Sequence, residues 1–579
     1  MRKVLFALLS ALITSSPAGA TCQVGKLLEF KVTMQGTRPI ADIGINGRSL
    51  PFVIDSGAFF STISPGTAAE LGLRLEPSPV QLRGIGGEAG KTYIAEVKSL
   101  DLAGLPIHNV QFIVGGSEMG AGGLLGQNVL GIGDVEYDLG HGAIRVMRSQ
   151  GCSANNSLAY WAGNTPVSDL AIDYRDTSHP HTVGTILVNG VKVRAVFDTG
   201  AGASILSLEA AKRAGLTPSS PGVVRAGPTR GLGRSLVETW LAPVGSVKIG
   251  AEEVRNIKIR IGDIDLEQAD MLIGADFFLS HRVYVANSLR RMYFTYDGGP
   301  VFNVEPARVV DQQGATQTIA ADSSPEPTDA AGFSRRGAAE TSLRDYKAAL
   351  ADLDRAVAME PSNGHYLLQR ARAEVLSGNR PAAFADLDRA VTVAPADPDI
   401  RLARAESLLS RRRREDALGD LAAADASLPS QADQRLVLAN IFERLDQFPK
   451  AIANFDQWIT AHPDDNRQPA ALNGRCWTRA LAGLDLSLAL KDCDAALRRE
   501  KSASYFDSRG LVELRMGEYD KAIADYDAAL QLAPRIAWSL YGRGLARRHK
   551  NDPASKGDLD AAVAIDPALP ARAQALGIS

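Results

Sequence analysis

Two short segments of this chain repeat one another, and each places an aspartate between an apolar run and a glycine turn. The first reads Phe52-Val-Ile-Asp55-Ser-Gly-Ala and the second reads Val196-Phe-Asp198-Thr-Gly-Ala. A carboxylate at the end of an apolar strand is costly to desolvate unless it is hydrogen-bonded or shares a proton with a second acid. The repetition therefore predicts that Asp55 and Asp198 form a pair.

The similarity continues downstream of each aspartate. Asp55 precedes Gly126 of a Leu-Leu-Gly element by 71 residues, and Asp198 precedes Gly274 of a Leu-Ile-Gly element by 76 residues. Between these points each copy has a glycine-rich bend and then alternating apolar and polar residues, which predict antiparallel strands joined by hairpins. The expected strands include residues 93–102 and 237–249. The first half of the chain is therefore interpreted as a tandem repeat of one β unit.

This ordered pair of motifs resembles the retropepsin-like aspartic proteases, in which Asp-Ser/Thr-Gly-Ala follows two apolar residues and precedes a glycine-tipped hairpin. The resemblance covers roughly residues 28–148 and 183–296. Two units in one polypeptide would form the pseudo-dimer that retroviral enzymes assemble from two chains. The resemblance thus implies an all-β, pepsin-type bilobal protease domain, with one unit at 21–152 and the other at 153–300.

The resemblance also implies roles for individual residues. Asp55 and Asp198 would share one proton, as in other aspartic proteases, and would activate a water molecule that attacks a peptide bond. Two glycines would allow close approach of the aspartate turns, and two hydroxyls would lock the turns together by hydrogen bonds. The residues with these locking roles would be Ser56, Gly57, Thr199 and Gly200.

The two glycine-rich bends are implied to be flaps that close over an extended peptide. Ordinary hairpin tips are the alternative. Neither bend has the strand–GxGxxG–helix context or the lysine of a phosphate-binding loop, which argues against a nucleotide site. The implied flap residues are Ile85, Gly86, Gly87, Leu232 and Gly233.

The two units differ after the apolar-apolar-Gly element, where the first has Gln127-Asn128 and the second has Ala275-Asp276. A degenerate pair that binds peptides without cutting them is therefore an alternative. Both units also have alanine three residues after the aspartate, where a hydroxyl would stabilise the charged carboxylate. We therefore expect a mildly acidic pH optimum if the pair is catalytic.

The start of the chain has the layout of a secretory signal, with Arg2 and Lys3, a short apolar run and the small residues Ala18-Gly-Ala20. We expect residues 1–20 to be removed and the protein to be periplasmic or secreted. The apolar run is shorter than the ~20 residues that cross a bilayer, so a membrane anchor is disfavoured. An oxidising compartment permits disulfides, with free buried thiols as the alternative. The expected pairs are Cys22 with Cys152 and Cys476 with Cys493.

The second half of the chain has a 34-residue period. Prolines recur at 361, 395, 429 and 463, and a small residue and a large apolar residue stand twelve and eight positions before each of them. This pattern resembles tetratricopeptide repeats, which form an all-α solenoid. We expect about seven repeats within residues 338–579, with a concave face that binds a protein partner. Residues 301–337, rich in Ala, Ser, Thr and Pro, are expected to be a linker.

Composition excludes some classes of function. A formal net charge of −3 does not indicate a nucleic-acid partner. The close pair His179 and His181 lacks metal-ligand spacing, so no metal or other cofactor is expected. The leading hypothesis is an exported aspartic endopeptidase, a monomer with one internally paired site, whose repeats recruit protein substrates. The alternative is an inactive peptide clamp and scaffold of the cell envelope.

Overall fold

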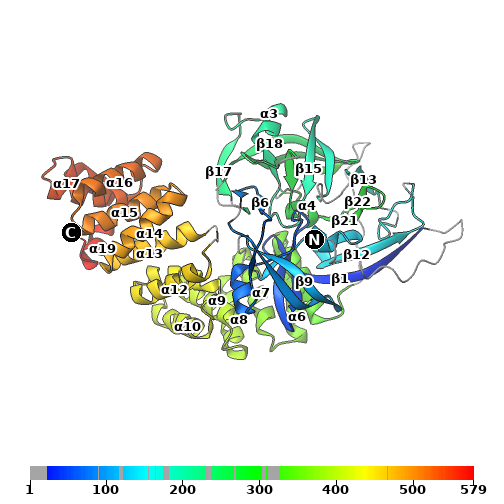
Figure 1. The fold of residues 1–579 in the computed structure, drawn as a ribbon, viewed down its shortest axis with the longest axis horizontal. Coiled ribbons are helices and arrows are strands. Elements are labelled where there is room, and N and C mark those ends of the chain that lie inside the picture. The colour runs from blue at the N-terminus through cyan, green and yellow to red at the C-terminus, as the bar shows by residue number, and fades with distance from the viewer. Residues whose placement is uncertain are drawn as a thin grey trace. The chain divides into compact units, whose positions relative to one another are not determined.

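The computed structural model (Figure 1) forms two compact units, Met1–Asp420 and Leu421–Ser579. It describes residues 22–578 except for 89, 117–120, 154, 164, 174–180, 230, 233–236, 267–268, 303–307, 311–325, 464 and 466. The expected signal, residues 1–20, and the expected flap residue Gly233 lie outside the described residues.

The first β lobe is built around hairpins that bury one face of each strand. In β2 and β3, Ala41 pairs with Phe52 and Ile43 with Leu50, which places alternate apolar side chains on one face, in the core. The expected strand at residues 93–102 coincides with β8. The strands are β1 (Gln23–Gln35), β2 (Arg38–Ile45), β3 (Arg48–Ile54), β4 (Thr62–Ile63), β5 (Glu76–Pro77), β6 (Arg83–Gly84), β7 (Gly87–Glu88), β8 (Tyr93–Leu102), β9 (Leu105–Val114), β10 (Gly123–Leu125), β11 (Asp134–Asp138) and β12 (Ala143–Gln150). The short helices are α1 (Pro65–Glu70), α2 (Gln127–Leu130) and the 3-10 helix η1 (Leu139–His141).

The second β lobe repeats this order of elements. Its hairpin β14–β15 corresponds to β2–β3, and the expected strand at residues 237–249 coincides with β18. The strands are β13 (Ser168–Ala171), β14 (Val183–Val188), β15 (Val191–Phe197), β16 (Ile205–Ser207), β17 (Val224–Thr229), β18 (Val237–Ile249), β19 (Glu252–Gly262), β20 (Met271–Ile273), β21 (His281–Ala286), β22 (Arg291–Tyr296) and β23 (Arg308–Val310). The helices are α3 (Leu208–Arg213) and α4 (Ala275–Phe278).

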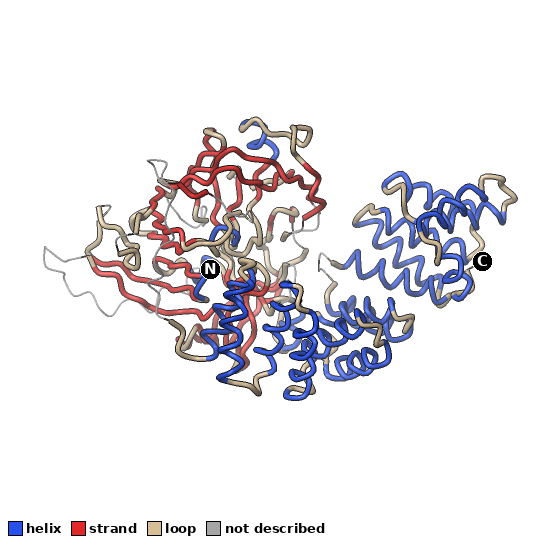
Figure 2. The backbone as a smooth tube through the Cα atoms, turned by 180° about the vertical axis from the view of Figure 1, so that it is seen from behind, coloured by secondary structure: helices blue, strands red, loops and turns tan. Residues whose placement is uncertain are grey.

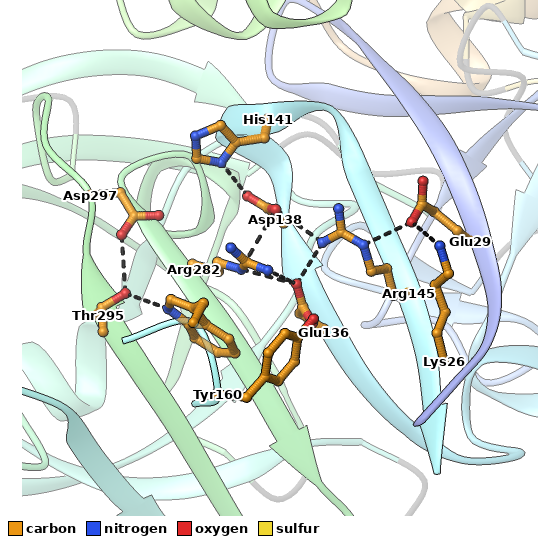
Figure 3. Close-up of polar contacts among 11 residues, drawn as sticks. Lys26, Glu29, Glu136, Asp138, His141, Arg145, Tyr160, Arg282, Thr295 and Asp297 are labelled. Atoms are coloured by element: carbon orange, nitrogen blue, oxygen red, sulfur yellow. Dashed lines mark hydrogen bonds and ion pairs between the residues drawn. The ribbon is translucent and has the colours of Figure 1, made fainter. Parts of the chain in front are cut away.

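One sheet joins the two lobes, because β11 of the first pairs antiparallel with β21 of the second. Beside this pairing lies a buried polar network (Figure 3). Glu136 is fully buried and accepts hydrogen bonds from Arg145 at 2.6 Å, from Arg282 at 2.7 Å and from the Tyr160 hydroxyl at 2.5 Å. Buried charges are tolerated only when they are paired in this way, so the network ties β11 and β12 to β21 and to the segment containing Tyr160.

Helices make up the rest of the chain (Figure 2). The described residues contain fourteen consecutive helices from α5 to α18, two for each of the seven expected repeats, and a short final helix. They are α5 (Ala330–Ser342), α6 (Tyr346–Met359), α7 (Gly364–Ser377), α8 (Arg380–Val393), α9 (Pro398–Ser410), α10 (Arg414–Ser427), α11 (Gln434–Arg444), α12 (Phe448–Ala461), α13 (Gln468–Ala482), α14 (Leu486–Arg499), α15 (Ala503–Arg515), α16 (Tyr519–Leu532), α17 (Ala537–His549), α18 (Ser555–Ile565) and α19 (Leu569–Ala575). The fold is thus bilobal β followed by an all-α repeat array.

The expected linker at 301–337 differs from the structure at both described ends. Helix α5 begins at Ala330, where the Asp329 side chain accepts a hydrogen bond from the Gly332 amide at 2.6 Å and caps the helix. Strand β23 pairs with β19 of the second lobe. The leading helix of the first repeat is therefore present, and the Ser342 hydroxyl on it donates to the Gly36 carbonyl of the first lobe at 2.6 Å.

Packing in the array follows the expected repeat positions. The small residues Ala349 and Ala383 and the large residues Leu353 and Leu387 are all buried. A glycine on the leading helix also allows close approach of the two helices of a pair. A Cβ added at Gly337 would lie 2.8 Å from Leu353 Cγ, so glycine there lets the large side chain of the trailing helix seat against its backbone.

Both expected disulfides are present. Cys22, before β1, is bonded to Cys152, after β12, and Cys476 on α13 is bonded to Cys493 on α14. Cys493 occupies the repeat position that holds a large apolar side chain elsewhere, so the bond replaces apolar packing between these two helices.

Within the described part of the chain, no helix is both long and apolar enough to cross a membrane.

Candidate active site

Each aspartate follows a strand whose end is held by a parallel neighbour. Ile54 of β3 pairs with Leu125 of β10, and Phe197 of β15 pairs with Ile273 of β20. The next residue in each case is the aspartate, whose amide donates to the neighbouring carbonyl, at 3.0 Å in the first lobe and 2.8 Å in the second. The apolar-apolar-Gly elements therefore hold the aspartate turns in place.

Four hydrogen bonds lock the two turns to each other with near two-fold symmetry. The Ser56 hydroxyl accepts from the Thr199 amide at 2.9 Å and donates to the Phe197 carbonyl at 3.0 Å. The Thr199 hydroxyl accepts from the Ser56 amide at 3.1 Å and donates to the Ile54 carbonyl at 2.8 Å. Both side chains are buried, so these bonds are shielded from water.

Glycine in each turn makes room for the carboxyl group of the other lobe. A Cβ added at Gly57 would lie 2.1 Å from Asp198 Cγ, and one added at Gly200 would lie 2.3 Å from Asp55 Cγ. Any side chain at either position would displace the opposite acid. The two carboxyl groups are hydrogen-bonded to one another.

Backbone amides hold one oxygen of each acid. Asp55 Oδ1 accepts from the amides of Gly57 and Ala58 at 2.8 and 2.9 Å, and Asp198 Oδ1 accepts from the amides of Gly200 and Ala201 at 2.8 and 3.3 Å. Burial raises the pKa of both acids, and the charge of Asp198 raises the pKa of Asp55 further, to well above its ordinary value. The hydrogen bond from Asp55 opposes the rise in the pKa of Asp198. Between the lower pKa and the higher pKa of the coupled pair, the two acids therefore hold one shared proton and one negative charge.

A third titratable residue, His181, lies beside the pair. Val183 pairs with Val196, and the Phe197 amide donates to the Thr182 carbonyl, so the register places His181 opposite Asp198. The charge of His181 lowers the pKa of Asp198. Sequence reasoning considered this histidine only as a metal ligand. Counting 17 residues back from each aspartate would have found it, with Arg38 at the same position in the first copy.

The helices beneath the two turns are braced alike despite their different sequences. Asn128 Oδ1 accepts from the amide and hydroxyl of Ser61 at 2.9 and 2.7 Å. Asp276 accepts from the amide and hydroxyl of Ser204 at 3.0 and 2.7 Å. The first unit therefore keeps the same hydrogen bonds from a serine amide and hydroxyl, although its sequence at this position differs from that of the second unit. Gln127 adds one more, from its side-chain amide to the Ser56 carbonyl at 2.8 Å.

The expected flap residues of the two lobes contact each other. The Gly86 amide donates to the Leu232 carbonyl at 2.9 Å, and a Cβ added at Gly231 would lie 2.3 Å from Ile85 Cγ1. Ile85 packs against an apolar cluster of the second lobe that adjoins Ala201, three residues from Asp198 in sequence. This apolar cluster consists of Ile205, Val237, Ile264 and Leu272.

The expected flap residue Gly87 lies in the hairpin β6–β7. Its φ is +86°, a conformation that favours glycine.

A second cluster of titratable groups, away from the pair, was not predicted from the sequence. Asp138, His141 and Asp297 have side-chain oxygen or nitrogen atoms within 4.8 Å of one another, which is close enough for metal ligands. Asp138 is already paired with Arg145 at 3.0 Å and lies 3.6 Å from Arg282 (Figure 3). These guanidinium groups compensate its charge, so we assign the cluster to the network between the lobes.

Comparisons with known families agree with this architecture. Residues 41–131 match the family model described as "gag-polyprotein putative aspartyl protease", and residues 184–277 match the model "Aspartyl protease". Residues 336–399, 402–466 and 503–536 match models of the tetratricopeptide repeat. The chain therefore combines two aspartyl protease-type β units with tetratricopeptide repeats. No curated protein matches the sequence.

Several solved structures have similarity to parts of the chain. The APC/C hetero-tetramer Cut9-Hcn1 is 16% identical with a TM-score of 0.32, and the match covers 44% of this chain and 49% of that one. A tetratricopeptide repeat protein from Parabacteroides merdae is 14% identical with a TM-score of 0.33, covering 43% and 98%. The type IV pilus biogenesis factor PilW is 16% identical with a TM-score of 0.31, covering 37% and 97%. The chain thus spans about half the length of the first of these.

Proposed function

We propose that this protein is an aspartic endopeptidase in which Asp55 and Asp198 form one catalytic pair. The observation that carries the proposal is the symmetric lock between Ser56 and Thr199, which brings two buried carboxyl groups from separate lobes into hydrogen-bond contact. Tight packing of two acids around a shared proton serves little structural purpose. It does suit a site that must hold one acid and one base at once.

The proposed reaction follows from these two protonation states. The ionised carboxylate takes a proton from a water molecule, which attacks the carbonyl carbon of a peptide bond. The protonated carboxyl donates a hydrogen bond to the carbonyl oxygen as negative charge develops there, and the proton then held by the pair passes to the leaving amine. No covalent intermediate with the enzyme forms. Because the acids titrate as a unit, the two roles belong to the pair.

The substrate that fits this site is an extended peptide. The flap bends supply backbone groups that can pair with a peptide strand once they part from each other. The apolar cluster now contacted by Ile85 would receive an apolar side chain of the peptide next to the bond that is cut. Because both acids come from one chain, we propose that the catalytic unit works as a monomer.

We further propose that the protein is exported and that its repeats recruit a protein substrate or partner. The two disulfides support an oxidising compartment, periplasmic or extracellular. Tetratricopeptide arrays bind peptides and proteins through their concave face.

The test of the activity is cleavage of an unfolded protein mixture across pH by the wild type and by Asp55→Asn and Asp198→Asn separately. The proposal expects both variants to lose cleavage. Asp42→Asn, an exposed aspartate on β2, is the matched control and should cut like the wild type. If the wild type never cuts but retains peptides, the protein is the inactive clamp; if either variant still cuts, the acids are not a catalytic pair.

A further inference from the structure

Six of the seven helix pairs that the structure describes share an ion pair between their two helices. In α7–α8, Arg370 donates through Nε and Nη2 to the carboxylate of Asp386 at 2.6 and 2.7 Å. Its Nη1 reaches back to Asp354 on α6 of the preceding repeat at 2.8 Å. We call the arginine at this position the ladder arginine and its bidentate partner the ladder aspartate. The ladder arginines are Arg336, Arg370, Arg404, Arg475, Arg509 and Arg543.

The residue four positions after the ladder arginine lies one helical turn further along the same face. In two repeats it is a second arginine that also binds the ladder aspartate. Arg479 donates to Asp492 at 2.6 Å, and Arg547 donates to Asp558 at 2.7 Å. Two arginines then bind one aspartate, and a second aspartate lies nearby. The positive and negative charges of this group are therefore equal in number.

In three repeats the same position holds a glutamate. A negative side chain then replaces the second positive one beside the ladder aspartate. Glu340, Glu374 and Glu513 each have an Oε2 that is buried and accepts no hydrogen bond. Glu374 and Glu513 are only 8% and 7% exposed. Here one guanidinium faces a buried glutamate as well as the ladder aspartate.

Each of these glutamates faces at least one aspartate as well as at least one basic side chain. Glu374 faces Asp386, Asp354 and Arg370, and burial together with the aspartates raises its pKa to about 7. Glu513 faces Asp525, to which it is hydrogen-bonded, and also Arg509 and Lys521; its pKa is raised to about 7. Glu340 faces Asp352, Asp345, Arg336 and His141, and its pKa is raised to about 8.

We propose that Glu340, Glu374 and Glu513 make the helical array responsive to protons. Each glutamate holds a proton while its repeat is packed against the ladder aspartate, and loss of that proton loosens the repeat. The repeats that contain Arg479 and Arg547 lack this response because a cation occupies the same position. Acidification therefore tightens selected repeats of the surface that would bind a partner, whether or not the β lobes cleave peptides.

The direction follows from the proton balance. The ordinary pKa of glutamate is 4.5, and the packed repeat raises that of Glu374 to about 7. Between these values the packed state binds more protons than the unfolded chain. The free energy of unfolding of the repeat therefore falls as pH rises through this range and stays low above it.

Hydrogen exchange of the full chain at about pH 5.5 and about pH 8.5, corrected for the intrinsic pH dependence of exchange, tests the proposal. The slow amides of α7–α8 should lose about tenfold in protection at the higher pH. Those of α15–α16 should lose at least as much, because buried Asp507 on α15, whose pKa burial raises to about 7, adds to the effect of Glu513. Those of α13–α14 and α17–α18 should change by less than about twofold. This comparison needs only the wild type, so it does not depend on whether any variant folds.

Two substitutions of Glu374 and one control complete the test. Glu374→Gln, which keeps a donor facing Asp386, and Glu374→Arg, which copies the Arg479 arrangement, should each abolish the pH response of α7–α8. Glu406→Gln, at an exposed position of α9, should leave it intact. Equal pH responses in all repeats, or a response of α7–α8 that survives both Glu374 substitutions, would overturn the proposal.

Discussion

At the scale of single residues, Ser56 and Thr199 each use one hydroxyl for two hydrogen bonds across the boundary between the lobes. Thr199 is fully buried, so replacing it with valine keeps the shape but leaves the Ser56 amide and the Ile54 carbonyl with a partner lost. Thr199→Val should lower the free energy of unfolding of the β lobes by about 2–3 kcal/mol. Denaturant unfolding measures this, with exposed Thr392→Val as the control; equal midpoints for the wild type and Thr199→Val would show that the lock contributes nothing.

His181 leads to a prediction about pH. Its positive charge lowers the pKa of Asp198, so His181→Gln should raise that pKa. Because the ionised carboxylate is the base, activity would then be lost at a higher pH on the acidic side of the profile. We therefore expect the acidic limb of the profile to move toward higher pH. The pH profile of kcat/KM measures it, and exposed His108→Gln is the control; a profile that moves toward lower pH would contradict the assignment.

The sequence predicts the residues that carry chemistry better than those that surround them. The repeated Asp-Ser/Thr-Gly-Ala segment was enough to select Asp55, Asp198 and the residues that bring them together. His181 was missed because it faces Asp198 through strand pairing, which a search for local motifs does not see. The buried glutamates of the helical array were missed for a similar reason, since their partners lie on another helix.

At the scale of elements, the two helices beneath the aspartate turns form an internal comparison. Asn128 and Asp276 accept equivalent hydrogen bonds from Ser61 and Ser204, but only Asp276 brings a buried charge, and burial raises its pKa to about 6. The charged form therefore costs stability as pH rises from 3.8 toward 6. Asp276→Asn should stabilise the protein by about 1–2 kcal/mol near pH 8 and have little effect near pH 4. Denaturant midpoints at both pH values test this, and an Asn variant that is less stable near pH 8 would contradict it.

Strands with regular alternation were predicted with their ends, as β8 and β18 show. Helix α5 was not, because the proline period that marks the repeats begins only at Pro361, beyond its end. Its own signal is the capping residue Asp329 before an alanine-rich segment. A single capping residue is a weaker sequence signal for a helix than a repeated spacing. The residues before it also have the composition of a linker, so the helix was not predicted.

At the scale of the whole molecule, the β lobes depend on contacts between segments that are distant in the chain. Pairing of β11 with β21 and the buried network around Glu136 join the lobes, and the hydrogen bond from Ser342 to Gly36 joins α5 to the first lobe. Tandem duplication predicts two lobes but not the sheet between them, since strand pairing over such separations has no local pattern. Because these contacts join the two lobes, Asp55 and Asp198 come to lie in one site.

A double-mutant cycle on Asp55 and Asp198 tests the central claim most directly. Peptide cleavage is measured for the wild type, Asp55→Asn, Asp198→Asn and the double variant. If the acids act as one catalytic unit, each single variant loses at least about a thousandfold in kcat/KM and the double variant loses no more than either single one. Losses that multiply in the double variant, or substantial activity in either single variant, would contradict a shared site.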